Sequence, residues 1–367
     1  MNSKFMACAA ILLATMNVSV ADANEDEHRA AFRTAYAEYE EVLDSGDVLA
    51  LVDAARRAYQ AGLRHFEPRN GNLPRLAVNY GNALVEAGDN DAGIAALIEA
   101  SELYEARGED KSTDLIPVFM QLGDLSGIPF DARPQRRFYR RALKIVEHHY
   151  GKDSAEYAHY SMHAGVGIVS KSSPEEARPF LEDGYEITRA TLGPDHPRTG
   201  IAAYHFGRFQ LIQDRYESAE EYLLEALRTL EDPSRPSSKL EVSVHAWLVN
   251  LYQETGRPDK STVHCRAIGE MTPYDEDQPY QPIYRRAPTY PLVALRSSKS
   301  GFVDLRFTVT DEGFVEEAEV LKWEGHESFA DAALDALQHF RFAPRFANGA
   351  PVATRNVDFR MSFEITR

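Results

Sequence analysis

The chain is 367 residues long, with 57 acidic and 40 basic residues and a formal net charge of −17 at pH 7. This negative charge repels the phosphate backbone and argues against a nucleic-acid-binding protein. The 44% hydrophobic and 26% charged residues are typical of globular domains and exclude collagen-like or wholly disordered chains. Two cysteines are too few for a disulfide framework or a four-cysteine zinc site.

Residues 1–23 have the pattern of a secretory signal peptide. Lys4 is the only charged residue before the apolar run 5–20, and the Ala-Asp-Ala sequence at 21–23 supplies the small residues of a cleavage site. As a helix the run would reach about 24 Å, which is short of the ~30 Å hydrocarbon core of a bilayer. We therefore expect cleavage and export, with an uncleaved membrane anchor as the alternative.

The region 27–271 repeats every 42 residues. Its clearest column consists of Gly81, Gly123, Gly165 and Gly207. Two further columns share this spacing: Ala58, Ala100, Ala142, Gly184 and Ala226, and Ala55, Leu97, Tyr139, Leu181 and Leu223. A fixed period in the range of about 20–50 residues indicates a solenoid. Each unit has the apolar spacing of two amphipathic helices, so we expect about six helix pairs.

The repeat unit that contains Gly207 has a characteristic spacing of small and apolar residues. Gly207 is followed by Ala219, Leu223 and Ala226 at offsets of 12, 16 and 19. This arrangement resembles the tetratricopeptide repeat (TPR), and the units, about eight residues longer than the usual repeat of ~34, resemble those of kinesin light chains. The resemblance implies an α-helical array that docks other proteins.

Residues 272–289 have the composition of a linker. Pro273, Pro279, Pro282 and Pro288 lie in this stretch, together with acidic residues at 275–277. Proline at this density disfavours helix and predicts an extended, semi-rigid connector.

Residues 290–367 change to strand-like periodicity. Apolar and polar residues alternate along 302–310 and 357–365, which predicts two half-buried strands, while the strand expected around 315–321 is less regular. Residues 327–339 have an amphipathic helical pattern. The expected fold is a small α+β domain of order ββαβ, in which one helix covers a three-stranded antiparallel sheet.

Several short motifs of this segment occur in the order found in the C-terminal domain of TonB. They are Tyr290-Pro291, Gly301-Phe302-Val303, Phe307-x-Val309, Gly313-x-Val315, Phe329 to Ala333, Phe340-Arg341-Phe342-Ala343-Pro344, Gly349-x-Pro351-Val352 and Phe363. The segment 290–367 therefore resembles this family. The resemblance implies binding of a short peptide, the TonB box, of outer-membrane transporters in the periplasm.

The last strand, expected at 354–365, can present a free edge that accepts one more strand. The candidate peptide-binding residues are Tyr290, Pro291, Arg355, Asn356, Val357, Asp358, Phe359 and Arg360. The alternatives are that the charges merely protect an edge strand and that Tyr290 only covers the core.

The function predicted from these features is a periplasmic adaptor that binds outer-membrane transporters and uses the TPR array as a second docking surface. The first alternative is a membrane-anchored energy transducer, although residues 5–20 contain no histidine and no extended proline-rich spacer is present. The second alternative is a structural scaffold of the envelope.

We expect no enzymatic activity, cofactor or metal. His159 and His163 have the i, i+4 spacing of metal ligands, and His148, His149 and Asp153 are nearby in sequence, but a polar helix face explains them better. Cys265 lies in an apolar column, which favours packing over a nucleophile. Tyr204, His205 and Arg208 are candidates for the lining of a TPR groove.

Overall fold

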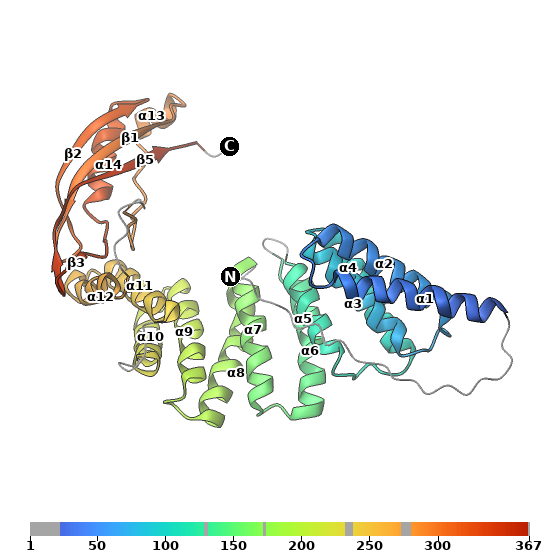
Figure 1. Cartoon of the computed structure of the whole chain (residues 1–367). Helices are drawn as coiled ribbons and strands as arrows, with labels where there is room; N and C mark the ends of the chain where they lie inside the picture. The colour runs from blue at the N-terminus through green and yellow to red at the C-terminus, as the bar shows by residue number, and fades with distance from the viewer. Residues whose placement is uncertain (1–22, 128–130, 172–173, 232–237, 273–279, 366–367) are drawn as a thin grey trace. The chain divides into compact units, whose positions relative to one another are not determined.

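The computed structural model describes residues 23–127, 131–171, 174–231, 238–272 and 280–365 (Figure 1). The predicted signal peptide, residues 1–23, lies outside this part of the chain except for Ala23. The chain divides into two compact units, one ending at Ser126 and the other starting at Gly127. The helical solenoid contributes to both units, and the small α+β domain belongs to the second.

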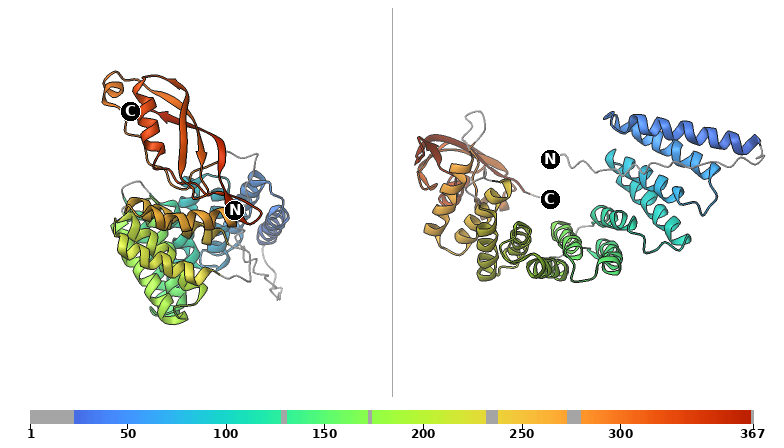
Figure 2. Two further views of the ribbon diagram at one scale, coloured as in Figure 1. Left: turned by 90° about the vertical axis from the view of Figure 1, so that its left-hand side faces the viewer. Right: turned by 60° about the horizontal axis from the view of Figure 1, so that its bottom comes forward.

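Twelve helices precede residue 273 in the described ranges, in agreement with the expected six pairs, and Figure 2 shows successive helices running back and forth. The first unit contains α1 (Ala23–Val42), α2 (Val48–His65), α3 (Asn72–Glu86), α4 (Asn90–Ala106) and α5 (Leu115–Leu125). The second contains α6 (Arg133–Tyr150), α7 (Ala155–Lys171), α8 (Pro174–Leu192), α9 (Pro197–Ile212), α10 (Tyr216–Leu230), α11 (Lys239–Glu254) and α12 (Pro258–Met271).

Local sequence fixes where several helices begin. The Asp47 carboxylate accepts the Ala50 N–H at 3.0 Å before α2. Ser238 and Glu241 form a reciprocal capping box at the start of α11. Such caps satisfy backbone donors that have no partner within the helix.

The glycine column provides close contacts between helices. A Cβ placed on Gly81 would lie 2.9 Å from Leu97 Cγ, and one on Gly165 would lie 2.5 Å from Leu181 Cγ. The residues that meet these glycines belong to the third repeating column. The columns predicted from the 42-residue period therefore contact one another, because the missing side chain of glycine lets the leucine approach closely.

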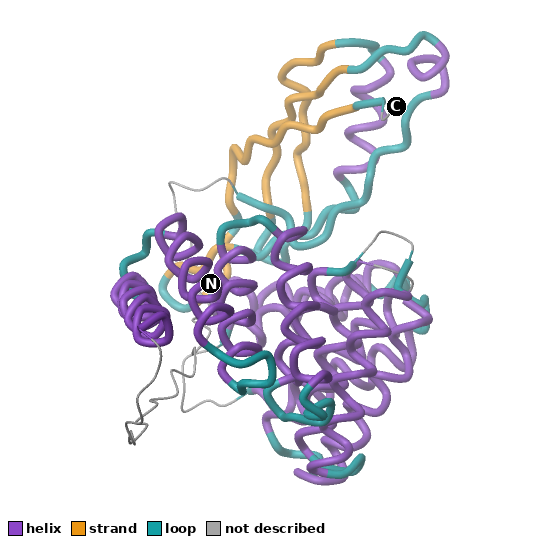
Figure 3. Tube along the Cα trace, turned by 90° about the vertical axis from the view of Figure 1, so that its right-hand side faces the viewer, coloured by secondary structure: helices purple, strands orange, loops and turns teal. Residues whose placement is uncertain are grey.

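The α+β domain has the predicted ββαβ core and a few additional short elements (Figure 3). Its elements are α13 (Leu292–Arg296), β1 (Gly301–Val309), β2 (Val315–Glu324), α14 (Ser328–Leu337), β3 (Arg345–Ala347), β4 (Ala350–Val352) and β5 (Thr354–Phe363). The three long strands form an antiparallel sheet of order β2-β1-β5. The two short strands form a separate hairpin, with Asn348 and Gly349 at positive φ in its turn.

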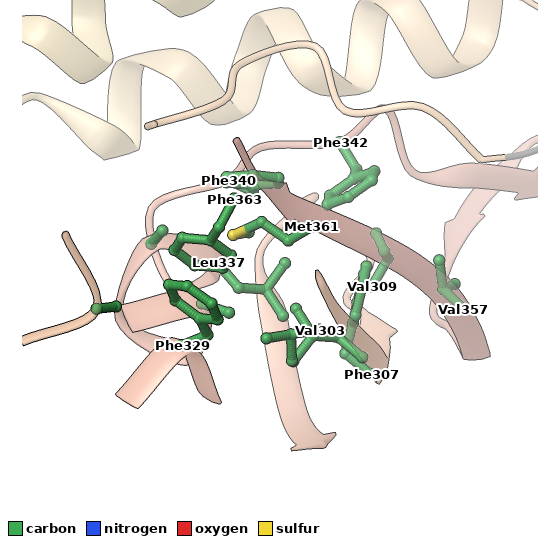
Figure 4. Packing of buried hydrophobic residues seen from close by; sticks show 14 residues of the cluster. Val303, Phe307, Val309, Phe329, Leu337, Phe340, Phe342, Val357, Met361 and Phe363 are labelled. Atoms are coloured by element: carbon green, nitrogen blue, oxygen red, sulfur yellow. The ribbon is translucent and has the colours of Figure 1, made fainter. Parts of the chain in front are cut away.

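One face of the sheet carries the hydrophobic core, and α14 packs against it (Figure 4). Val303, Phe307 and Val309 of β1 are buried, and the polar residues between them lie on the other face. Phe329 and Leu337 of α14 complete the core from the helix side. The expected alternation therefore determines which face of β1 is covered.

Candidate functional site

β5 lies at an edge of the sheet, as the sequence predicted. Its register with β1 runs from Gly301 opposite Phe363 to Phe307 opposite Val357. In the described part of the chain, no strand pairs with the other side of β5. Backbone N–H and C=O groups of alternate residues along this edge therefore have no partner in the sheet and can pair with an added strand.

The candidate residues of β5 divide between the two faces of the sheet. Val357 is buried and Phe359 is half-buried on the side that α14 covers, whereas Asp358 and Arg360 are exposed on the open face. Arg360 makes a bidentate pair with Asp304 of β1 at 2.7 and 2.8 Å. Asp358 accepts an equivalent pair from Arg306 at 2.7 and 2.9 Å.

These pairs affect the charge that the open face presents. The Arg306 guanidinium lowers the pKa of Asp358, and Arg360 does the same for Asp304. Arg360 also lies over the half-buried ring of Phe302, 3.9 Å from its centroid. Asp358 and Arg360 are thus engaged by β1, which the sequence did not reveal.

Arg355 and Asn356 have different surroundings, because β5 bulges there. Two residues of β5 separate Thr354 from Val357, whereas one residue of β1 separates their partners Val309 and Phe307. Asn356 has a φ of 57°, as expected in a bulge. Both side chains are exposed, and neither hydrogen-bonds nor pairs with a charged group in the described ranges. They are therefore the candidate side chains that remain available to a partner.

Tyr290 and Pro291 lie near the opposite end of β5. The Tyr290 ring meets Phe363 and Phe329 edge to face, with centroids 5.8 and 5.5 Å away, and its hydroxyl donates to the Lys299 carbonyl. Pro291 is the N-cap of α13. The structure thus brings Tyr290 to the strand, and the ring also covers the core.

The other edge strand, β2, is less suited to pairing. Its register with β1 shifts twice, and Glu317 has a φ of 51°. Glutamates at 316, 317, 319 and 324 are exposed along it. Bulges and charge are common ways to block an edge. These bulges explain why apolar and polar residues alternate irregularly in the sequence around 315–321.

Arg341 connects the α+β domain to the last repeat. This side chain is 1% exposed, and its Nη2 donates to Thr262 Oγ1 on α12 at 2.9 Å and to the Glu312 carbonyl at 2.8 Å. Its guanidinium carbon lies 3.5 Å from the centre of the Phe314 ring. On the surface beside it, Arg266 of α12 pairs with Glu312 at 3.3 Å.

Tyr284, within the predicted linker, also belongs to this interface. It pairs with Arg341 as an isolated β-bridge, and its hydroxyl donates to Glu254 of α11 at 2.8 Å. The segment that follows residue 279 therefore contacts the α+β domain through its backbone and the array through the Tyr284 side chain. The positions of the domain boundaries stay predictions.

The other candidate residues lie on helices of the array, Cys265 on α12, Tyr204 and Arg208 on α9, and His159 on α7. Burial raises the pKa of Cys265 to about 11, so its thiol is protonated at neutral pH. Tyr204 is buried, and Arg208 lies over its ring and that of Trp247, with centroids at 5.4 and 4.9 Å. His159 has its pKa lowered, chiefly by burial.

In the described ranges, the cluster of three residues with metal-ligand chemistry is elsewhere, at Glu231, Glu241 and His245. The i, i+4 spacing of Glu241 and His245 is the sequence signal for this cluster, which was not among the predicted sites. Within the same ranges no helix combines the length and the apolar character needed to span a bilayer.

An open cavity of about 480 Å³ lies beside the residue that precedes β5, Ala353. The other lining residues come from the turn between β1 and β2 and from its flanking strand ends: Thr308, Thr310, Asp311, Glu312, Phe314, Val315 and Glu316. Its acidic lining is close to the bulged end of β5.

Comparison with known proteins found a family match for one segment of the array and for the α+β domain. Residues 286–365 match the family described as Gram-negative bacterial TonB protein C-terminal, and residues 170–232 match the tetratricopeptide repeat family. None of the curated proteins matches the chain.

Solved structures with a similar arrangement of helices were also found. BtubC (BKLC) from P. vanneervenii is 16% identical with a TM-score of 0.46, over 72% of this chain and 97% of that one. Acl4 (residues 1–338), the assembly chaperone of RpL4, is 17% identical with a TM-score of 0.45, over 65% and 89%. PilF from Pseudomonas aeruginosa is 13% identical with a TM-score of 0.38, over 68% and 95%.

Proposed function

Since this chain joins tetratricopeptide repeats to a TonB C-terminal domain, we propose that it is a periplasmic adaptor which binds an extended segment of an outer-membrane transporter. The segment would add to the sheet as a fourth strand beside β5. The observation that carries the proposal is the position of β5 at the edge of the sheet. The TPR array would provide a second surface for a protein partner, and the role assigned to the chain is binding without catalysis.

The difference between the two edges supports β5 as the docking strand. From Val357 to Phe363 its register with β1 is regular, so alternate residues along this stretch offer their free backbone N–H and C=O groups without interruption by a bulge. β2 is interrupted by two register shifts and carries exposed glutamates. A strand that added to β2 would lose several of its hydrogen bonds at the bulges.

The structure also refines which side chains select the partner. Asp358 and Arg360 are neutralised by β1, so they would contribute little charge selectivity. Arg355 and Asn356, at the bulge, are free to contact a side chain of the added strand. The acidic cavity next to Ala353 lies at the same end, which favours a partner with a basic residue there.

Strand addition can be tested by altering the backbone of the peptide and leaving the protein unchanged. The full chain would be titrated with fluorescent peptides taken from the periplasmic N-terminal segments of outer-membrane transporters. Two isomers of a binding peptide would be compared. One would carry N-methyl groups on the odd-numbered residues and the other on the even-numbered residues. Because neighbouring residues of a strand point their N–H groups to opposite sides, only one of the two isomers has methyl groups on the side that faces β5. That isomer should lose binding and the other should retain it.

Variants of the protein locate the site. Arg355→Ala should weaken binding severalfold, while Glu324→Gln on the β2 edge serves as the matched control and should leave it unchanged. Amide chemical shifts should change along 355–363. The proposal fails if both N-methyl isomers bind equally, if the shifts follow β2, or if no transporter segment binds.

A further inference from the structure

One imidazole and two carboxylates converge where α10 ends and α11 begins. Glu231 directly follows α10, while Glu241 and His245 are four residues apart on α11 and therefore share one face of that helix. The possible ligand atoms of the three residues all lie within 4.8 Å of one another. His245 Nε2 is 3.8 Å from Glu231 Oε1.

Neighbouring groups hold two of these side chains in place. His245 is 5% exposed, and its Nδ1 lies 2.8 Å from Nδ1 of His264 on α12. The His264 ring in turn stacks on Tyr252, with centroids 5.6 Å apart. Glu241 Oε2 accepts the backbone N–H of Ser238 at 3.2 Å. His245 and Glu241 thus each use one polar atom for a fixing contact and keep another for a ligand, as ligands with outer-shell support do in metal sites.

The charges in this cluster also favour a cation. Glu231 and Glu241 bring two carboxylates together, and in the described ranges neither forms an ion pair with lysine or arginine. His245 Nε2 has no hydrogen-bond partner there either, since 3.8 Å to Glu231 is too long for a hydrogen bond. A cation placed among the three groups would meet all of them.

We propose that Glu231, Glu241 and His245 bind a divalent transition-metal ion, and that the ion fastens α11 to the end of α10. Zn²⁺ fits this ligand set, because it accepts one imidazole and two carboxylates and completes a tetrahedron with water. The imidazole argues against Ca²⁺ and Mg²⁺, which prefer oxygen ligands alone. Glu231, whose side chain is half exposed, has the freedom to close the remaining distance.

In this arrangement His264 is a positioning residue. A ring that binds metal through Nε2 carries its proton on Nδ1, and the Nδ1–H of His245 then donates to His264 Nδ1. The contact fixes both the tautomer and the direction of the ring.

Calorimetry with Zn²⁺ on the metal-free full chain tests the site. We expect one strong site, weakened about tenfold or more in Glu231→Gln and about a hundredfold in His245→Gln. Glu231 is exposed, so its variant folds even if the buried His245 variant does not. His163→Gln, which removes an exposed histidine of α7, is the control and should bind Zn²⁺ as the native chain does.

X-ray absorption at the zinc edge distinguishes this site from surface histidines. The expected spectrum has one imidazole and oxygen ligands at about 2.0–2.2 Å. His264→Phe keeps a ring against Tyr252 but removes the acceptor, so it should lower the Zn²⁺ affinity about tenfold while one imidazole remains bound. Two or more imidazoles, unchanged affinity in Glu231→Gln, or no binding by the native chain would each overturn the proposal.

Discussion

Asp358 and Arg360 are exposed side chains that are nevertheless occupied. Each lies on the open face of the sheet and makes a bidentate contact with the residue directly opposite on β1. Alternation along a strand predicts which face a residue occupies, but the register with a strand more than fifty residues away is set by the whole sheet. Their exposure was therefore predictable from the sequence and their pairing was not.

His205 on α9 should make the stability of the second unit depend on pH. Burial, with a smaller effect of Arg208, lowers the pKa of this imidazole to about 4. In the unfolded chain it titrates near ~6.5, so protonation below that pH favours unfolding. The stability contributed by neutral His205 is complete above pH ~6.5 and is lost as the pH falls towards about 4. At pH 5 the loss should reach about 2 kcal/mol.

Urea denaturation near neutral pH and at pH ~5 would measure this effect. Between the two conditions, His205→Gln should lose about 2 kcal/mol less of its free energy of unfolding than the native chain. His163→Gln, at an exposed position, should follow the native chain. An identical pH dependence in all three proteins would show that protonation of His205 does not contribute to the loss of stability.

At the scale of the helices, we expect alanine substitution at different glycines of the column to change stability by different amounts. A Cβ on Gly165 would lie 2.5 Å from Leu181 Cγ and 3.0 Å from the Leu181 backbone nitrogen, whereas on Gly207 it would lie 3.0 Å from Leu223 Cγ. Alanine favours a helix over glycine by about 1 kcal/mol. We expect Gly165→Ala to destabilise the chain by about 1–3 kcal/mol through overpacking, and Gly207→Ala to be nearly neutral.

Urea denaturation of both variants checks this order. Leu181→Ala removes the side-chain atoms that the new Cβ would contact. The Leu181→Ala substitution should therefore lower the free energy of unfolding less in the Gly165→Ala variant than in the native chain. The prediction would be wrong if the two glycine variants lost the same free energy of unfolding. It would also be wrong if the effects of Gly165→Ala and Leu181→Ala were additive in the double variant.

The strands show how far sequence patterns reach. β1 and β5 were expected at 302–310 and 354–365, and they extend over Gly301–Val309 and Thr354–Phe363. The hairpin strands β3 and β4 were not predicted, because three residues are too few to show a period. In β2 the bulges broke the alternation on which the prediction relied.

At the scale of the second unit, the contact between the array and the α+β domain could not be foreseen. Arg341 was recognised only as part of a family motif, and the hydroxyl that it binds, on Thr262, is 79 residues away in sequence. Prolines in the predicted linker indicated an extended backbone, yet they carry no information about its partner. Tyr284 pairs there with Arg341, so the described end of this segment contributes to the interface.

The close fit of α12 against residues 344–346 predicts that the two parts of this unit are coupled. A Cβ on Gly269 would collide with the Pro344 carbonyl and lie 3.1 Å from the Phe346 ring. Gly269→Ala should therefore weaken the interface by about 1–3 kcal/mol. Because amide exchange follows the free energy of local opening, we expect exchange to accelerate about 5- to 150-fold in residues 341–346 and in the second half of α12.

Hydrogen exchange followed by mass spectrometry on the full chain measures both regions and the core of the sheet together. The strands β1 and β5 should keep their protection in Gly269→Ala, because their core is formed with α14 and does not involve Gly269. Val263→Ala, at an exposed position of α12, is the matched control and should exchange as the native chain does. Unchanged exchange at 341–346 would mean that the interface does not depend on this contact. Equal loss of protection in β1 would instead mean that the whole α+β domain unfolds whenever its contact with α12 opens.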